Sequence, residues 1–463
     1  MPVCPLAERG LTESRRETCG MAQRTPKLNL KTLHRSAYGW PLRQLRIPQA
    51  HKITRGSKSV IVAVVDLGYR QHPHHKRHLW VNPSPSRGDV HGWDCADDDA
   101  TLEFSGGPES DYYRDHHAFI VGEVIACAPA CPVMPVRVGY GHRDSWWRGI
   151  DYAVEHGAKV LVMPHGYIPT GADGVTMQFY QGTDFAYPAD NPRMRRSMEA
   201  AWDAGCLIFR GTADNRGRRV AAFDAATAAA ITVGSSNPSG DAADIACSAD
   251  YVEVAAPGGQ GNSGNLKDHV WSTNGAGGYT ACAGGCMASG FAGGVAALIW
   301  SRFPKLTNAQ VRQIMCNTAT LDEWDDRLGW GVLDAARAVG LQPDRIEQHL
   351  HVKRNACTLA RRRGKPVLLV DVENRGVLDV LKCLVAAFTG DPGRPAAPRA
   401  TMDKPVILAT RQIGHAIGPV RGLHAARFEI ALTEKPPAAV WLQVCTLDLR
   451  GSNAVQNVRV KMP

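Results

Sequence analysis

A cysteine flanked by small residues is the first feature of the chain that suggests chemistry. It lies in Gly284-Gly-Cys-Met-Ala-Ser-Gly290, and an apolar stretch follows as far as Trp300. This pattern predicts a helix that Cys286 opens. A helix N-terminus supplies unpaired N–H groups and positive partial charge, which favour a thiolate. The alternative is that Cys286 is a small residue packed in a tight turn.

Three polar residues elsewhere in the chain are candidates to act with a thiol. Asp66 ends a buried strand predicted over residues 59–65, where open α/β sheets place their sites, although many such aspartates only cap a turn. His116 opens a small-residue, apolar helix, where a histidine can also be structural. Asn215 follows the strand predicted over residues 206–209; it either satisfies its turn or directs its amide at a developing oxyanion.

The segments that must position these residues alternate between strand and helix from Tyr38 to about Leu341. Short β-branched runs predict strands at 59–65, 159–163, 206–209, 230–233 and 251–255. Amphipathic or apolar patterns predict helices at 147–156, 194–204, 288–302 and 308–318, the last with Thr307 as N-cap. This alternation predicts an α/β fold with a parallel sheet covered by helices.

The pattern changes after Gly340. Strand-like segments at 366–372, 380–388, 426–432 and 439–444 follow one another without a helix of useful length. We therefore expect three parts: a poorly ordered leader at 1–37, a larger α/β domain at 38–341 and a small all-β, sandwich-like domain at 345–463.

Composition narrows the class of protein. The net charge is +9, but the basic residues are scattered, so no nucleic-acid partner is predicted. The 13 cysteines show no repeating spacing, which fits a reducing compartment better than a disulfide scaffold. No signal peptide and no membrane-spanning run is visible, so the sequence as given predicts a cytoplasmic protein, or a secreted one if its start is misassigned.

Together these motifs resemble the subtilisin-like peptidase family, the subtilases. The segment around Cys286 is similar to the family's Gly-Thr-Ser-Met-Ala-Ser-Pro, with cysteine in place of the nucleophilic serine, and the order Asp, His, nucleophile is the one found in subtilisin. The similarity runs from Gly39-Trp-Pro-Leu to Gly329-Trp-Gly-Val-Leu-Asp334, or roughly residues 38–341. It implies a subtilisin-like sheet flanked by helices.

The resemblance assigns roles by motif. Asp66 would orient His116, and His116 would be the general base toward Cys286 and then the acid toward the leaving amine. His116 is preferred to His117 because counting back from Gly122 puts it at the family's catalytic position.

Four further residues take their roles from the same resemblance. Asn215, aligned through the downstream Gly217, would be the side-chain oxyanion donor. Pro164, His165 and Gly166 stand where the family has its substrate-facing Ser-Leu-Gly, and the proline removes a backbone N–H near the strand that pairs with substrate.

The chain also departs from the family pattern beside the nucleophile. Gly285 replaces the family's threonine, Gly290 replaces its proline, and residues 167–193 form a longer insertion beside the cleft. Three functions follow. The first is an endopeptidase with an Asp-His-Cys triad and an acyl-enzyme intermediate. The alternatives are a catalytically impaired pseudoprotease that binds extended peptides, and a transpeptidase or maturation enzyme for one dedicated peptide.

The remaining expectations concern ligands and assembly. The acidic run Asp94, Asp97, Asp98 and Asp99 offers oxygen ligands of the kind that calcium prefers, but four carboxylates on a six-residue loop are more often solvated. We therefore assign no metal and no other cofactor. A peptide or protein substrate and a monomeric chain are expected.

Overall fold

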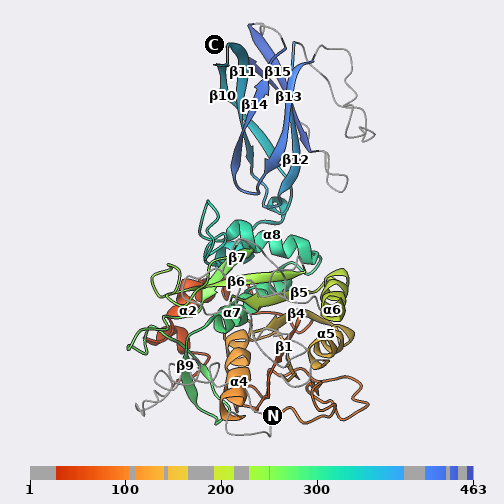
Figure 1. Ribbon diagram of the computed structural model, residues 1–463, viewed down its shortest axis with the longest axis vertical. Helices are drawn as coiled ribbons and strands as arrows, with labels where there is room; N and C mark the ends of the chain where they lie inside the picture. Colours follow the sequence, from red (N-terminus) through yellow and green to blue (C-terminus); the bar gives the residue numbers. More distant parts are fainter. Residues whose placement is uncertain are drawn as a thin grey trace, which may run out of the picture. The chain divides into compact units, whose positions relative to one another are not determined.

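The computed structural model divides the chain into two compact units, Met1–Gly340 and Leu341–Pro463 (Figure 1). It describes residues 28–103, 110–139, 144–164, 192–212, 229–249, 251–389, 412–433, 438–446 and 456–461. Among these residues no helix is long and apolar enough to cross a membrane.

A seven-stranded parallel sheet forms the centre of the first unit (Figure 1). Its strand order is β2 (Trp93–Asp94), β3 (Val133–Arg137), β1 (Ile61–Asp66), β4 (Ala158–Met163), β5 (Leu207–Gly211), β6 (Ala230–Ser236) and β7 (Val252–Pro257). Every ladder between these strands is parallel. Strands buried on both faces are expected to be continuously apolar, and β1 is so from Ile61 to Val65 and β4 from Val160 to Met163. The predicted α/β fold is confirmed.

Two pairs of helices cover the two faces of this sheet. Leu161 and Met163 of β4 share a core with α5 (Ser145–Glu155) and α6 (Pro192–Asp203). Val160 and Val162, which alternate with them, face α7 (Gly285–Arg302), and α4 (Ser110–Cys127) packs against α7. The helix predicted to open at Cys286 is therefore present, with Cys286 in its first turn.

Small residues allow α4 and α7 to approach each other closely. A Cβ atom at Gly294 of α7 would lie 2.5 Å from the Cβ atom of Cys127 on α4. A Cβ at Gly122 of α4 would lie 2.3 Å from the hydroxyl oxygen of Thr273, at the end of β8 (Val270–Thr273). The first contact brings α7 close to α4, and the second brings α4 close to β8.

The first unit also contains several shorter elements. Residues 28–37, part of the segment that the sequence predicts to be a poorly ordered leader, include the 3₁₀ turn η1 (Leu33–Arg35), and Leu30 and Leu33 are buried. The other elements are α2 (Trp40–Gln44), α3 (Ile47–Ala50), β9 (Tyr279–Cys282), α8 (Asn308–Thr318) and α9 (Ala335–Val339). Thr307 caps α8 through a capping box with Gln310, as predicted.

The second unit begins with η2 (Pro343–Arg345) and contains two antiparallel sheets (Figure 1). One sheet has the order β10 (Leu350–Arg362), β11 (Lys365–Asn374) and β14 (Ala425–Ala431); the other has the order β13 (Gln412–Val420), β12 (Val380–Phe388), β15 (Ala439–Thr446) and β16 (Gln456–Lys461). Side chains from both sheets share one apolar core, so the unit is a β-sandwich. The sequence patterns missed β10, β13 and β16.

Candidate active site

Asp66 lies at the carboxyl end of β1 and is fully buried. Its Oδ1 atom accepts a hydrogen bond from the backbone N–H of Leu67 at 2.8 Å. Its Oδ2 atom accepts a hydrogen bond from Nδ1 of His116 on α4, also at 2.8 Å. The end of β1 thus places a carboxylate, and α4 places an imidazole, at the same edge of the sheet.

The charge of the His116 ring is set by its neighbours. Burial by itself lowers the pKa of an imidazole, but the Asp66 carboxylate and the Cys286 thiol raise the pKa of His116 to about 10. Cys286 raises the pKa of His116 through a hydrogen bond and through its charge, so its sulfur lies beside the imidazole. At neutral pH the structure therefore favours a protonated His116, which is the partner that a thiolate requires.

The neighbouring His117 has a different environment. Its Nδ1 atom donates a hydrogen bond to the Leu67 carbonyl oxygen at 2.5 Å, and its side chain is completely buried. Burial lowers its pKa, so the ring is neutral at pH 7. His117 packs beneath the site, whereas His116 holds the hydrogen bond to Asp66.

Cys286 is half-buried in the first turn of α7. Its Sγ atom donates to the Pro164 carbonyl oxygen at 3.2 Å, just beyond the end of β4. The structure also explains the glycine that precedes it: a Cβ at residue 285 would lie 2.1 Å from the carbonyl oxygen of Thr212. Gly285 therefore lets the helix start approach the end of β5.

Glu123 is a residue near the site that the sequence analysis did not select. It lies on α4, is 1% exposed, and neither carboxyl oxygen has a hydrogen-bond partner. Burial, and then the negative charge of a Cys286 thiolate, raise its pKa well above the usual value, so the carboxyl is neutral. Its sequence signal was a lone acidic residue in the apolar run from Phe119 to Ala126.

Gly290 provides the space that Glu123 occupies. A Cβ atom at residue 290 of α7 would lie 2.2 Å from Oε2 of Glu123. The glycine that replaces the family's proline and the buried glutamate of α4 are thus two parts of one local arrangement. It lies one helical turn from Cys286.

The other predicted site residues are only partly covered by the structure. Pro164 is described, and its carbonyl oxygen contacts the thiol as given above. Asn215, His165 and Gly166 lie outside the described residues, as does nearly all of the 167–193 insertion.

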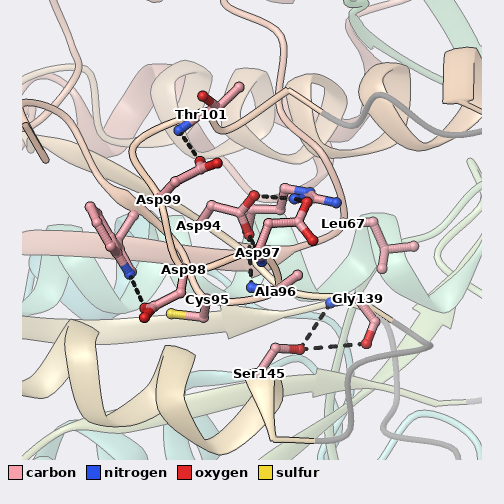
Figure 2. A network of polar contacts seen from close by, with 12 residues as sticks. Leu67, Asp94, Cys95, Ala96, Asp97, Asp98, Asp99, Thr101, Gly139 and Ser145 are labelled. Atoms are coloured by element: carbon pink, nitrogen blue, oxygen red, sulfur yellow. Dashed lines mark hydrogen bonds and ion pairs between the residues drawn. The ribbon is translucent and has the colours of Figure 1, made fainter.

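The acidic loop does not present converging ligands for calcium. Arg137 binds the carboxylates of both Asp94 and Asp97, the latter at 2.6 Å, and the loop's own backbone donates to Asp94 (Figure 2). Asp98 accepts from the Trp93 indole and Asp99 from the Thr101 backbone (Figure 2). Within the described residues no group of three or more His, Cys, Asp or Glu side chains is arranged to hold a metal ion. The carboxylates of this loop therefore do not fit a calcium site.

Comparison with known proteins identifies the family. The model of the subtilase family, peptidase family S8, matches residues 57–331. The chain belongs to the subtilase family of proteases.

Similar proteins agree with that assignment. Thermitase from Thermoactinomyces vulgaris is 26% identical over 287 residues, which are 60% of this chain and 86% of thermitase. The thermostable alkaline protease of Halalkalibacterium halodurans is 25% identical over 308 residues, covering 65% of this chain and 73% of that protein. Among solved structures, a lanthipeptide protease superposes with a TM-score of 0.54 at 20% identity, covering 69% of this chain and 99% of its own. That structural likeness supports the fold.

Proposed function

We propose that the chain is an endopeptidase in which Cys286 is the nucleophile, His116 the general acid and base, and Asp66 the group that orients and charges His116. The observation that carries the proposal is the buried Asp66–His116 hydrogen bond of 2.8 Å next to a half-buried thiol. The family supplies the reaction class, peptide-bond hydrolysis.

The chemistry follows from these positions. With His116 protonated, Cys286 reacts as a thiolate, which attacks the carbonyl carbon of the scissile peptide bond. The C–N bond breaks as His116 gives its proton to the leaving amine, which leaves a thioester on Cys286. Water then attacks the thioester, the neutral His116 accepts its proton, and the carboxylic acid departs as the thiolate re-forms.

The oxyanion of each tetrahedral intermediate needs donors. The backbone N–H groups at the start of α7 lie at the nucleophile itself and carry the positive end of the helix dipole. By its likeness to the family, Asn215 would add a side-chain donor. Pro164, His165 and Gly166 would face the substrate, with Pro164 presenting its carbonyl oxygen but no N–H.

The test is covalent labelling followed by turnover. The purified chain is treated with a peptidyl chloromethyl ketone, and its intact mass and tryptic peptides are measured. We expect one equivalent of probe on Cys286, and hydrolysis of a peptide library that Cys286→Ala abolishes. Cys282→Ala is the matched control, because Cys282 is also half-buried and lies four residues away; it should label and cleave like the wild type.

The other outcomes separate the alternatives. Extended peptides that bind equally well to the wild type and Cys286→Ala, without acylation, would identify a pseudoprotease. Products that contain a new amide bond, formed when an amine attacks the thioester, would identify a transpeptidase. Hydrolysis that persists in Cys286→Ala would contradict the triad.

A further inference from the structure

A second cavity lies in the catalytic unit away from Cys286. It has a volume of about 700 Å³ and is lined on one side by Ile125 and Ala126 at the end of α4 and by the turn that follows. His116 and Ile125 are nine residues apart on α4, which corresponds to about 14 Å along the helix axis. This cavity is therefore separate from the candidate active site.

The charge of its lining is one-sided. Eight basic or histidine side chains line the cavity and none of the lining residues is acidic; the eight are Lys31, His34, His51, Arg55, His74, Lys76, Arg77 and His78. No described carboxylate lies within ion-pair distance of the four lysine and arginine side chains. Four cations that line one cavity, with no carboxylate of the described residues to pair with them, produce a local positive potential.

The pKa values of the neighbouring histidines reflect that positive potential. Burial is the first cause that lowers the pKa of His51 and His78, and repulsion from Arg55, and from Arg77 and Lys31, lowers it further. These rings are held in place by the end of α4: His51 donates to the Cys127 carbonyl oxygen at 2.6 Å. His78 donates to the Pro129 carbonyl oxygen at 2.8 Å.

Two carbonyl oxygens at and just after the end of α4 already have partners other than the four cations. His51 binds the carbonyl oxygen of Cys127, the last residue of α4, and His78 binds that of Pro129 in the turn that follows. The residues that precede the described chain are no better a partner, because positions 1–27 contain five basic and three acidic residues. Arg77 also donates to Nε2 of His78 at 3.0 Å, but none of the four cations has an acidic partner among the described residues, so their charge is available to a ligand.

The rest of the lining is apolar. Leu42, Ile47 and Ile125 contribute hydrophobic side chains beside the charged ones. A cavity of this size lies in the range of about 300–1,000 Å³ that suits a small organic molecule. Lysine and arginine side chains bind phosphate groups through charge-assisted hydrogen bonds. We propose that this cavity binds a small organic polyanion of the nucleoside polyphosphate class, with its ring against the apolar wall and its phosphates among Lys31, Arg55, Lys76 and Arg77.

Calorimetric titration of the full chain with ATP at low ionic strength tests the proposal. We expect binding at one site, and weaker binding of inorganic triphosphate and of adenosine, which each lack one half of the ligand. The double variant Arg55→Glu/Lys76→Glu should weaken ATP binding by at least about tenfold. Cys286→Ala should bind ATP unchanged, so failure of the peptidase proposal leaves this one standing.

A matched control separates the cavity from the overall charge of the protein. Lys267→Glu/Lys305→Glu makes the same change in net charge at two exposed lysines outside the lining, and should leave ATP binding within about twofold of the wild type. The proposal is overturned if ATP does not bind at millimolar concentration, or if the control pair weakens binding as much as the cavity pair. It is also overturned if an Asp/Glu hexapeptide binds more tightly than ATP.

Discussion

The α4–α7 contact and the acidic loop at residues 94–99 both bury carboxyl groups, but they satisfy them differently. In the loop, Asp94 is paired with Arg137 and accepts two backbone N–H groups (Figure 2). Next to Cys286, both oxygens of the buried Glu123 lack a hydrogen-bond partner. Buried polar groups in native proteins are nearly always paired, so the unpaired one needs an explanation.

This difference in hydrogen bonding distinguishes the acidic loop, which is structural, from the group around Cys286, where the proposed reaction takes place. Burial raises the pKa of Asp94, whereas the backbone N–H groups and Arg137 act to lower it. A carboxyl group held by these donors fixes the loop and has little capacity left for a ligand. A carboxyl group kept neutral by burial adds no negative charge next to a thiolate. Glu123 can therefore lie close to Cys286 without opposing the negative charge that the proposed reaction requires.

The largest expected effect is on turnover. Asp66→Asn removes the charge that raises the pKa of His116, so that burial dominates and the pKa falls from about 10. We expect the rate of peptide hydrolysis to fall by about 10⁴-fold, as for the equivalent change in a serine-protease triad. NMR titration of His116 checks the cause, and an unchanged rate or an unchanged His116 pKa would contradict the assignment.

Substitutions in the acidic loop should change the stability of the protein and not its rate of peptide hydrolysis. Arg137→Met leaves Asp94 buried without its counter-ion, which should lower the free energy of unfolding by about 3–5 kcal/mol. Asp97→Asn is the control: this carboxylate is half-exposed, so the loss should stay below about 1 kcal/mol. Denaturant titration measures both, and added calcium should not restore either variant.

A double-mutant cycle tests the local fit between α4 and α7. Gly290→Ala forces a methyl group into the position of the Glu123 carboxyl, and should cost about 1–3 kcal/mol of stability. Glu123→Ala empties that position, so the double variant should recover most of the cost of Gly290→Ala. Chemical denaturation of the four proteins gives the coupling energy, and simple additivity would show that the two residues do not share the space.

The last prediction concerns the pH dependence of stability. The pKa of Glu123 is raised in the folded protein, so its contribution to stability is complete below the unfolded value of 4.5 and is lost as the pH rises toward the folded value. Glu123→Gln keeps the shape but cannot ionise. The stability of this variant relative to wild type should therefore rise by up to about 1.4 kcal/mol per pH unit above pH 5. Melting curves from pH 5 to 8 measure it, and parallel curves would argue against a neutral, buried Glu123.

Much of the fold could be predicted because its elements have strong local patterns. The buried strand ending at Asp66, the helix at 308–318 with its Thr307 cap, and the strand at 380–388 follow from periodicity and capping rules alone. The long strand β10 was missed because its Lys, Arg and Asn residues interrupt the apolar alternation. β16 lies in a short segment with only two buried valines, too little pattern to identify.

The sequence by itself determined the family, the order of the elements and the candidates Asp66, His116 and Cys286, because residue type and spacing carry that information. The tertiary structure adds which ring α4 turns toward β1: His116 binds the Asp66 carboxylate, and His117 binds the Leu67 carbonyl oxygen. It also revealed the fit of Glu123 to Gly290 and the basic cavity at the end of α4. Those arrangements join residues distant in the chain, and local sequence patterns do not encode such distances.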